Sequence, residues 1–212
     1  MRVIVCGSAH RTGSRGWTDA IALRRFLLAI RAASPTIIHG ASHSKGADHL
    51  VDAEAEALGI LRDPYPVESD LDGYGRSAPI RRNSRMIAES FPQVGAAFVI
   101  GNVGEAVGTK GHYLTNGSDH IVNLLRSHGR AVVVYRENGI EPCRDLAEAR
   151  DVLGCLWRAN LYREDVERAG KAVRDAAQGP EAVIAARAAV EALRVARPTL
   201  APWLAPVEMT LQ

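Results

Sequence analysis

The residues best suited to chemistry in this chain lie in a glycine-rich segment, residues 101–111, with the sequence GNVGEAVGTKG. It follows the apolar run AAFVI at residues 96–100, which is typical of a buried strand. A glycine-rich turn directly after a strand lets backbone N–H groups approach an anion closely. A helix that begins near Thr109 would add the partial positive charge of its N-terminus. The segment is therefore predicted to bind phosphate through Gly104, Gly108, Thr109 and Lys110.

Two other short apolar runs also end in small or polar residues. Residues 1–6 lead into Gly7 and Ser8, and residues 36–38 lead into His39 and Gly40. Such runs indicate central parallel strands that are buried on both faces. In an open α/β sheet, ligands bind outside the carboxyl ends of the strands, so all four residues are predicted to contact a ligand. The alternatives are that the glycines only form tight turns, that Ser8 caps a helix, and that His39 is a packed residue.

Several polar residues on the predicted helices each have two possible uses. Asp48 follows Gly46 at a helix start, so it either caps that helix or accepts a hydrogen bond from a ribose hydroxyl. Asn83 both donates and accepts, so it either contacts a base or sugar or satisfies the backbone of a loop. The neighbours Arg81 and Arg82 must diverge, whereas Arg81 and Arg85 share a helix face and are either exposed or meet a longer anion.

The elements that must position these residues alternate between strand and helix along residues 1–136. Helices are predicted at residues 17–33, with Thr18 or Asp19 as the cap, and at residues 47–59, 79–90 and 118–128. A third strand opens at residues 59–61, residues 63–66 and 70–75 form a loop, and residues 132–135 form the last strand. The alternation predicts an α/β fold with a Rossmann-like, doubly wound, mostly parallel sheet in a nucleotide-binding domain, residues 1–138.

A helical extension is predicted over residues 139–212. Pro142 precedes one helical pattern, a second carries Val166 and Val173, and Gly179-Pro180 starts a third. These patterns indicate a helical hairpin that packs either on the sheet or on another copy of the chain, and a separate ligand-binding domain is the alternative. The tail, residues 200–211, is predicted to be docked rather than helical, because it contains several prolines.

Composition narrows the class of protein. At 212 residues the chain holds one full α/β domain and an appendage, and no apolar run approaches the roughly 20 residues that span a bilayer. The first strand begins at residue 2, so no signal peptide is expected. The three cysteines are too widely spaced for a disulfide framework or a zinc site, so a reduced cytoplasmic protein without metal or cofactor is predicted. A net charge of +2 does not demand a nucleic-acid partner.

Five motifs along residues 1–136 together resemble one protein family. They are VIVCGS at residues 3–8, WTD at 17–19, HGA at 39–41, KGAD at 45–48 and RNSRM at 82–86. In this order and spacing they resemble the YspA/YpsA-related branch of the SLOG superfamily, to which the LOG (lonely guy) phosphoribohydrolases and the DNA-processing protein DprA/Smf also belong. The resemblance implies a Rossmann-like sheet that binds a nucleotide or nucleotide-derived ligand, and a possible homodimer formed through helices.

Comparison with the LOG enzymes bears on catalysis. Their Arg-Lys-x-x-Met helix is matched by Arg82 and Met86, so Arg82 is predicted to point inward and to act on the phosphate or ribose. Gly104, Gly108 and Thr109 supply a looser form of their glycine motif, but His112 stands at the position of its glutamate. A histidine cannot supply the same permanent negative charge beside an oxocarbenium ion. The nearest carboxylate in sequence is Glu105, so Arg82 and Glu105 are the catalytic candidates if the protein is an enzyme.

The sequence thus predicts a sensor or binding protein for a small nucleotide or nucleotide derivative, with no membrane partner. A hydrolase that cleaves an N-glycosidic or phosphate bond of such a ligand is the alternative. A DprA-like binder of single-stranded DNA is disfavoured, because no aromatic residues interleave with the basic ones to stack on bases.

Overall fold

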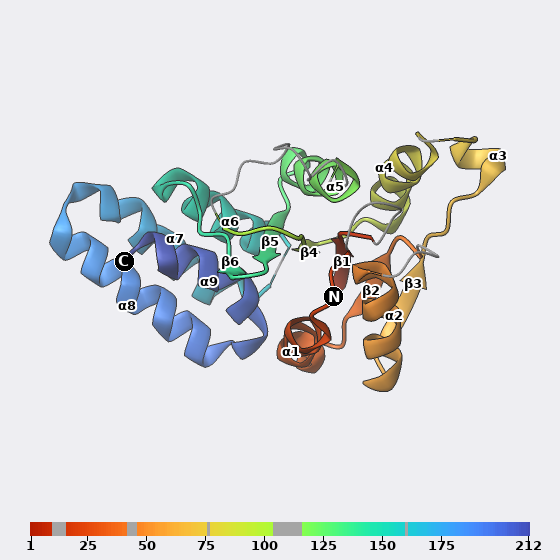
Figure 1. Cartoon of the computed structure of the whole chain (residues 1–212). Helices are drawn as coiled ribbons and strands as arrows, with labels where there is room; N and C mark the ends of the chain where they lie inside the picture. Colours follow the sequence, from red (N-terminus) through yellow and green to blue (C-terminus); the bar gives the residue numbers. More distant parts are fainter. Residues whose placement is uncertain (10–15, 42–45, 76, 104–115, 160) are drawn as a thin grey trace.

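A computed structural model gives the fold, and it describes residues 1–9, 16–41, 46–75, 77–103, 116–159 and 161–212 (Figure 1). The strands are β1 (Arg2–Gly7), β2 (Thr36–His39), β3 (Leu61–Pro64), β4 (Val94–Phe98), β5 (Ala131–Arg136) and β6 (Gly139–Ile140). The helices of the first part are α1 (Ala20–Ile30), α2 (Ala47–Ala57), α3 (Ser69–Asp72), α4 (Ala78–Ser90) and α5 (Asn116–Ser127). The helices of the C-terminal part are α6 (Leu146–Arg158), α7 (Arg163–Asp175), α8 (Pro180–Ala196) and α9 (Ala201–Thr210). Short 3-10 helices are η1 (Arg31–Ala33), η2 (Ala176–Gln178) and η3 (Pro198–Leu200).

The strands form a six-stranded sheet in the order β3-β2-β1-β4-β5-β6, consistent with a Rossmann-like fold. Within the part of the chain that the structure describes, β1 to β5 are parallel, and β6 pairs antiparallel with its neighbour, β5. β1 lies at the centre, with Ile4 beside Ile38 of β2 and beside Gly95 of β4. Because the five strands are parallel, their carboxyl ends meet at one edge of the sheet.

Apolar side chains on both faces of the sheet explain its burial. On one face Val3 and Val5 belong to a core that includes residues of α1, α2 and the C-terminal helices. On the other face Ile4 and Cys6 belong to a second core with residues of α4 and α5. Alternate residues of β1 thus enter opposite cores, as expected for a strand between two layers of helices. The predictions of buried strands at the N-terminus, at residues 36–38 and at residues 132–135 are confirmed.

The predicted loop after the third strand is partly wrong. β3 extends through Pro64, and α3 forms a short helix within the stretch predicted to be irregular. β3 has only β2 as a neighbour, and proline is tolerated on such an edge strand because one side of its backbone needs no ladder bond. Leu61 is 70 % exposed there, so the apolar signal that marks the central strands is missing.

The sheet also continues past the strand predicted to be last. Glu137 and Asn138 form the turn of a tight hairpin, and β6 then pairs with β5 through Arg136 opposite Gly139. The boundary predicted after residue 138 therefore falls at a hairpin turn rather than at the end of the sheet.

The tail is docked as predicted, but it is helical. Pro202 lies in the first turn of α9, where a proline N–H is not needed, so only Pro206 costs an interior helix bond. The Pro206 carbonyl accepts hydrogen bonds from the Cys143 N–H at 3.3 Å and from the Thr210 hydroxyl at 2.9 Å. The three helical patterns before the tail are confirmed as α6, α7 and α8.

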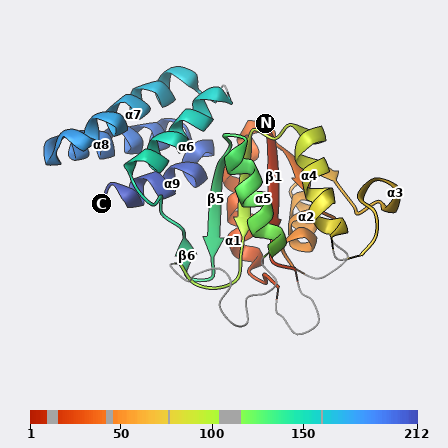
Figure 2. The ribbon, with the colours of Figure 1, turned by 90° about the horizontal axis from the view of Figure 1, so that it is seen from above.

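The C-terminal helices pack on the sheet of their own chain. Residues of α6 to α9 share one continuous apolar core with one face of the sheet, and both views place these helices beside β5, at the opposite end of the molecule from α3 (Figure 2). This is one of the two arrangements predicted for the extension. Within the described ranges, no helix combines the length and apolar character needed to cross a bilayer.

Candidate functional site at the carboxyl edge of the sheet

The predicted site residues of the first two strands lie at the carboxyl edge of the sheet. Ser8 follows β1, Gly40 follows β2, and Gly101 lies a few residues beyond β4. From β1 the chain moves outward to β2 and β3, then returns past β1 to β4. The direction of the connections therefore reverses between β1 and β4, and ligands of open α/β sheets bind at such a reversal.

Gly7 is required by close packing. A Cβ atom at this position would overlap the Phe98 carbonyl oxygen of β4 and the Cβ atom of Ala47 in α2. The glycine therefore lets α2 approach the end of β1, which explains it without a ligand.

Replacing Gly7 with alanine is expected to lower the free energy of unfolding by about 1–3 kcal/mol, the usual cost of overpacking, because the clash involves backbone atoms that cannot rotate away. Urea unfolding measures the change. The control is Gly117→Ala in the first turn of α5, where an added Cβ meets no atom within 4 Å. That variant should be as stable as the wild type or slightly more stable. Equal stability of both variants would contradict the packing role of Gly7.

Ser8 directly follows the carboxyl end of β1, where it connects β1, β4 and α2, and it is 1 % exposed. Its N–H donates to the Phe98 carbonyl at 2.9 Å, and its hydroxyl accepts from the Ile100 N–H at 3.1 Å. Its carbonyl accepts from the N–H groups of Trp17 and Ala47. Ser8 thus braces the ends of β1 and β4 against the start of α2.

The first residues of the glycine-rich segment are held by the β5–β6 turn. The Gly101 N–H donates to the Glu137 carboxylate at 2.9 Å, and the Val103 N–H donates to the Asn138 side-chain oxygen at 2.7 Å. These N–H groups are therefore not available to an anion, in contrast to the expectation for the start of this segment. Gly104, Glu105, Gly108, Thr109, Lys110 and His112 lie outside the described residues, so their predicted roles stay predictions.

Arg82 points inward from α4, as predicted, and is 7 % exposed. It donates from Nη1 to the Tyr65 carbonyl at 2.8 Å and from Nε to the Asn83 side-chain oxygen at 2.9 Å. A Cβ atom at Gly40 would overlap the guanidinium, so the glycine after β2 makes room for this cation. Burial lowers the pKa of Arg82, and the charges of Asp48 and Asp72 oppose that shift. The guanidinium keeps its positive charge, because an arginine side chain is not deprotonated in proteins.

The other two predicted polar contacts are both near Arg82. Asn83 is 2 % exposed, and its amide nitrogen donates to the Gly117 carbonyl at 3.2 Å, so it links α4 to the start of α5. This is the backbone-satisfying role. Asp48 lies in the first turn of α2, whose N-cap is Gly46, so the carboxylate is not the cap. Burial lowers the pKa of both Arg82 and His39, and the charge of Asp48 opposes this shift at both groups, so Asp48 acts on the same edge of the sheet.

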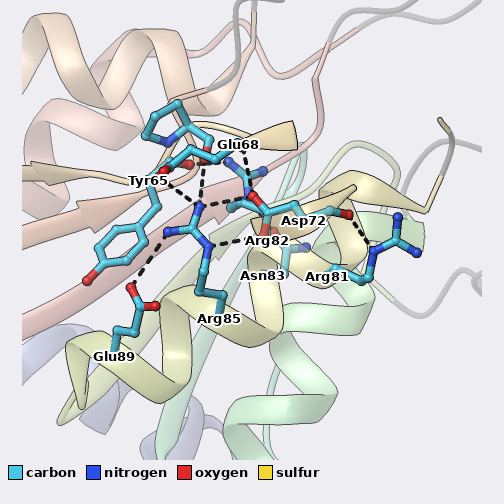
Figure 3. A network of polar contacts seen from close by, with 9 residues as sticks. Tyr65, Glu68, Asp72, Arg81, Arg82, Asn83, Arg85 and Glu89 are labelled. Atoms are coloured by element: carbon cyan, nitrogen blue, oxygen red, sulfur yellow. Dashed lines mark hydrogen bonds and ion pairs between the residues drawn. The ribbon is translucent and has the colours of Figure 1, made fainter. Parts of the chain in front are cut away.

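Arg81 and Arg85 of α4 both donate hydrogen bonds to Asp72 and so connect α4 to α3 (Figure 3). Arg85 donates to both carboxylate oxygens of Asp72, at 3.0 and 2.9 Å, and Arg81 donates to the Asp72 carbonyl and to Ser77. Asp72 is 1 % exposed, and Arg85 holds its pKa below the usual range. The prediction missed this carboxylate, and the available signal was an acidic stretch about ten residues before the arginines.

Several hollows lined by described residues lie near the sheet. A groove of about 890 Å³ runs between α2 and β3 and begins at His39 and Ala41, the carboxyl end of β2. A smaller hollow of about 470 Å³ lies between β5 and α6, and Cys143 and Cys155 line it. Burial raises the pKa of the Cys143 thiol to about 11, so it stays protonated and is not a ready nucleophile.

Comparisons of the chain with models of protein families, with curated proteins and with solved structures find no significant match.

Proposed function

We propose that the protein binds a nucleotide or nucleotide-derived ligand at the carboxyl edge of its sheet, as a sensor or binding protein with the doubly wound fold of the SLOG superfamily. The observation that carries the proposal is the reversal of strand connections between β1 and β4, with Ser8 and Gly101 beyond the two strand ends. The resemblance of the five sequence motifs to that superfamily supports the same ligand class.

The buried cation beside this reversal favours an anionic ligand. Two N–H groups of Arg82 donate to described residues, and a guanidinium carries five. Gly40 follows the end of β2, the strand next to β1. Because Gly40 has no side chain, the Arg82 guanidinium can lie against it at this edge of the sheet. A phosphate above the strand ends would bring negative charge toward Arg82, and charge-assisted hydrogen bonds are about twice as strong as neutral ones.

Isothermal titration with AMP, ADP, ATP, NAD⁺ and ADP-ribose tests the proposal. At least one is expected to bind the wild type, and Arg82→Met is expected to weaken that binding by about 10- to 100-fold, through loss of hydrogen bonds to a charged group.

Arg81→Met is the matched control, because Arg81 is the next residue on α4 and faces α3 instead. It should bind like the wild type, and thermal unfolding of both variants shows whether the fold persists. The proposal is wrong if the wild type binds none of the five compounds, or if folded Arg82→Met binds as tightly as the wild type.

A further inference from the structure

The groove between α2 and β3 has a polar wall formed by one face of α2. Asp48, Asp52 and Glu56 are four residues apart and follow one another along this face. β3 forms the opposite wall, including Leu61 and Arg62, and His39 closes the end next to β2. At about 890 Å³ the groove lies within the size range of small-molecule sites.

Asp52 is held at one oxygen within this groove. Its Oδ1 atom lies 3.0 Å from Nη1 of Arg62 and 3.3 Å from Nε2 of His39. Its side chain is 44 % exposed, and over the described ranges Oδ2 accepts no hydrogen bond. A carboxylate with one anchored and one open oxygen is suited to accept hydrogen bonds from hydroxyl groups.

His39 contributes a buried donor without a hydrogen-bond partner. It is 2 % exposed, and its Nδ1 atom accepts from the Ala41 N–H at 3.3 Å, so we assign the proton of the neutral ring to Nε2. Burial lowers the pKa of His39, which favours this neutral form. Nε2 lies 3.3 Å from Oδ1 of Asp52 without forming a hydrogen bond, so among the described residues this donor is unsatisfied. Because 3.3 Å leaves no room for an oxygen atom between Nε2 and Oδ1, a hydroxyl that accepts from Nε2 must displace the Asp52 side chain, which is 44 % exposed.

We propose that this groove binds the ribose of the nucleotide and selects a free 2′-hydroxyl; the inference rests on the proposed function. From a phosphate above the end of β1, the sugar reaches the groove by extending over β2, the neighbouring strand that carries His39, with Asp52 of α2 beside it. The hydroxyl groups of the cis-diol donate hydrogen bonds to Asp52, and one of their oxygens accepts a hydrogen bond from Nε2 of His39. A 2′-phosphate is excluded, because Arg62 pairs with Asp52 and Glu56 and leaves excess negative charge on the α2 face.

Titration with AMP, GMP, CMP and UMP, each beside its 2′-deoxy counterpart, tests the selection. The wild type is expected to bind the preferred ribonucleotide about 10- to 100-fold more tightly than its deoxy form, the effect of losing a hydrogen bond to a charged group. Asp52→Asn should bring this ratio to within about threefold, mainly by weakening the ribonucleotide. Adenosine 2′,5′-bisphosphate should bind the wild type more weakly than AMP.

Glu54→Gln is the matched control, because Glu54 lies on α2 but faces Arg24, with which it pairs at 2.7 Å, and does not line the groove. It should keep the wild-type ratio. If ribo and deoxy forms bind the wild type equally, or if Asp52→Asn weakens both forms by the same factor, the ribose site is refuted while the proposed nucleotide binding stands. If no nucleotide binds the wild type, both are refuted.

Discussion

Replacing Trp203 with alanine should lower the free energy of unfolding by about 3–5 kcal/mol, the usual cost of removing a large aromatic side chain from a core. Trp203 is 1 % exposed and is the largest fully buried side chain among the described residues. Its indole N–H donates to the Gly95 carbonyl of β4 at 3.0 Å, and its ring packs edge-to-face on Phe26 of α1 at 5.8 Å. Urea unfolding followed by circular dichroism measures the loss.

Trp203→Phe separates packing from the hydrogen bond. It keeps an aromatic ring and leaves the Gly95 carbonyl without this donor, so it should cost less than the alanine variant, about 1–3 kcal/mol. A Trp203→Ala protein within 1 kcal/mol of the wild type would show that the C-terminal helix is not part of the core of the sheet.

Replacing Arg85 with methionine should destabilise the protein by about 3 kcal/mol, because it leaves the Asp72 carboxylate buried without its counterion. This is the lower end of the range for buried ion pairs. The lower end is expected because α3 lies at the periphery of the molecule, where water can reach the carboxylate after a small opening (Figure 1). Urea unfolding at pH 7 measures the change. Arg81→Met should cost less, because Arg81 binds the Asp72 carbonyl and not its carboxylate.

The pH dependence of the same pair gives a second readout. Arg85 lowers the folded-state pKa of Asp72, so the pair adds stability above the unfolded-state pKa, about 3.9, and loses it as pH falls through the lower folded-state value. The difference in stability between wild type and Arg85→Met should therefore be full at pH 6 and shrink below about pH 4. A difference that stays constant from pH 6 to pH 2.5 would show that Asp72 does not depend on Arg85.

The elements with strong local signals were predictable. The apolar runs of β1, β2, β4 and β5 are buried on both faces, so their composition alone marks them as strands. Asp19 accepts from the Ala22 N–H at 2.9 Å and caps α1, one of the two residues predicted for that role. Edge strand β3 and proline-containing α9 gave weaker signals, because each depends on a neighbour for its stability.

The candidate site was predictable only in part. The inward direction of Arg82 followed from the motif, but Gly7 is explained by packing against Phe98 and Ala47. Asp52, which carries the proposed ribose site, had no local signal, since it is one of several acidic residues on an exposed helix face. Asp52 differs from the other acidic residues of the helix because it contacts His39, a residue of β2, the strand that precedes α2 in the sequence.

The sequence by itself determined the alternation of strands and helices, the buried strands and the capped start of α1, because periodicity and capping act within a few residues of one another. Only the tertiary structure decided the pairings between distant segments: Asp72 with Arg85, Gly101 with Glu137, and Trp203 with Gly95. Each of these side chains is common in sequence, and its partner is set by the order of strands in the sheet and by which helix covers which face. That order is fixed by the summed burial of two cores, which no single segment encodes.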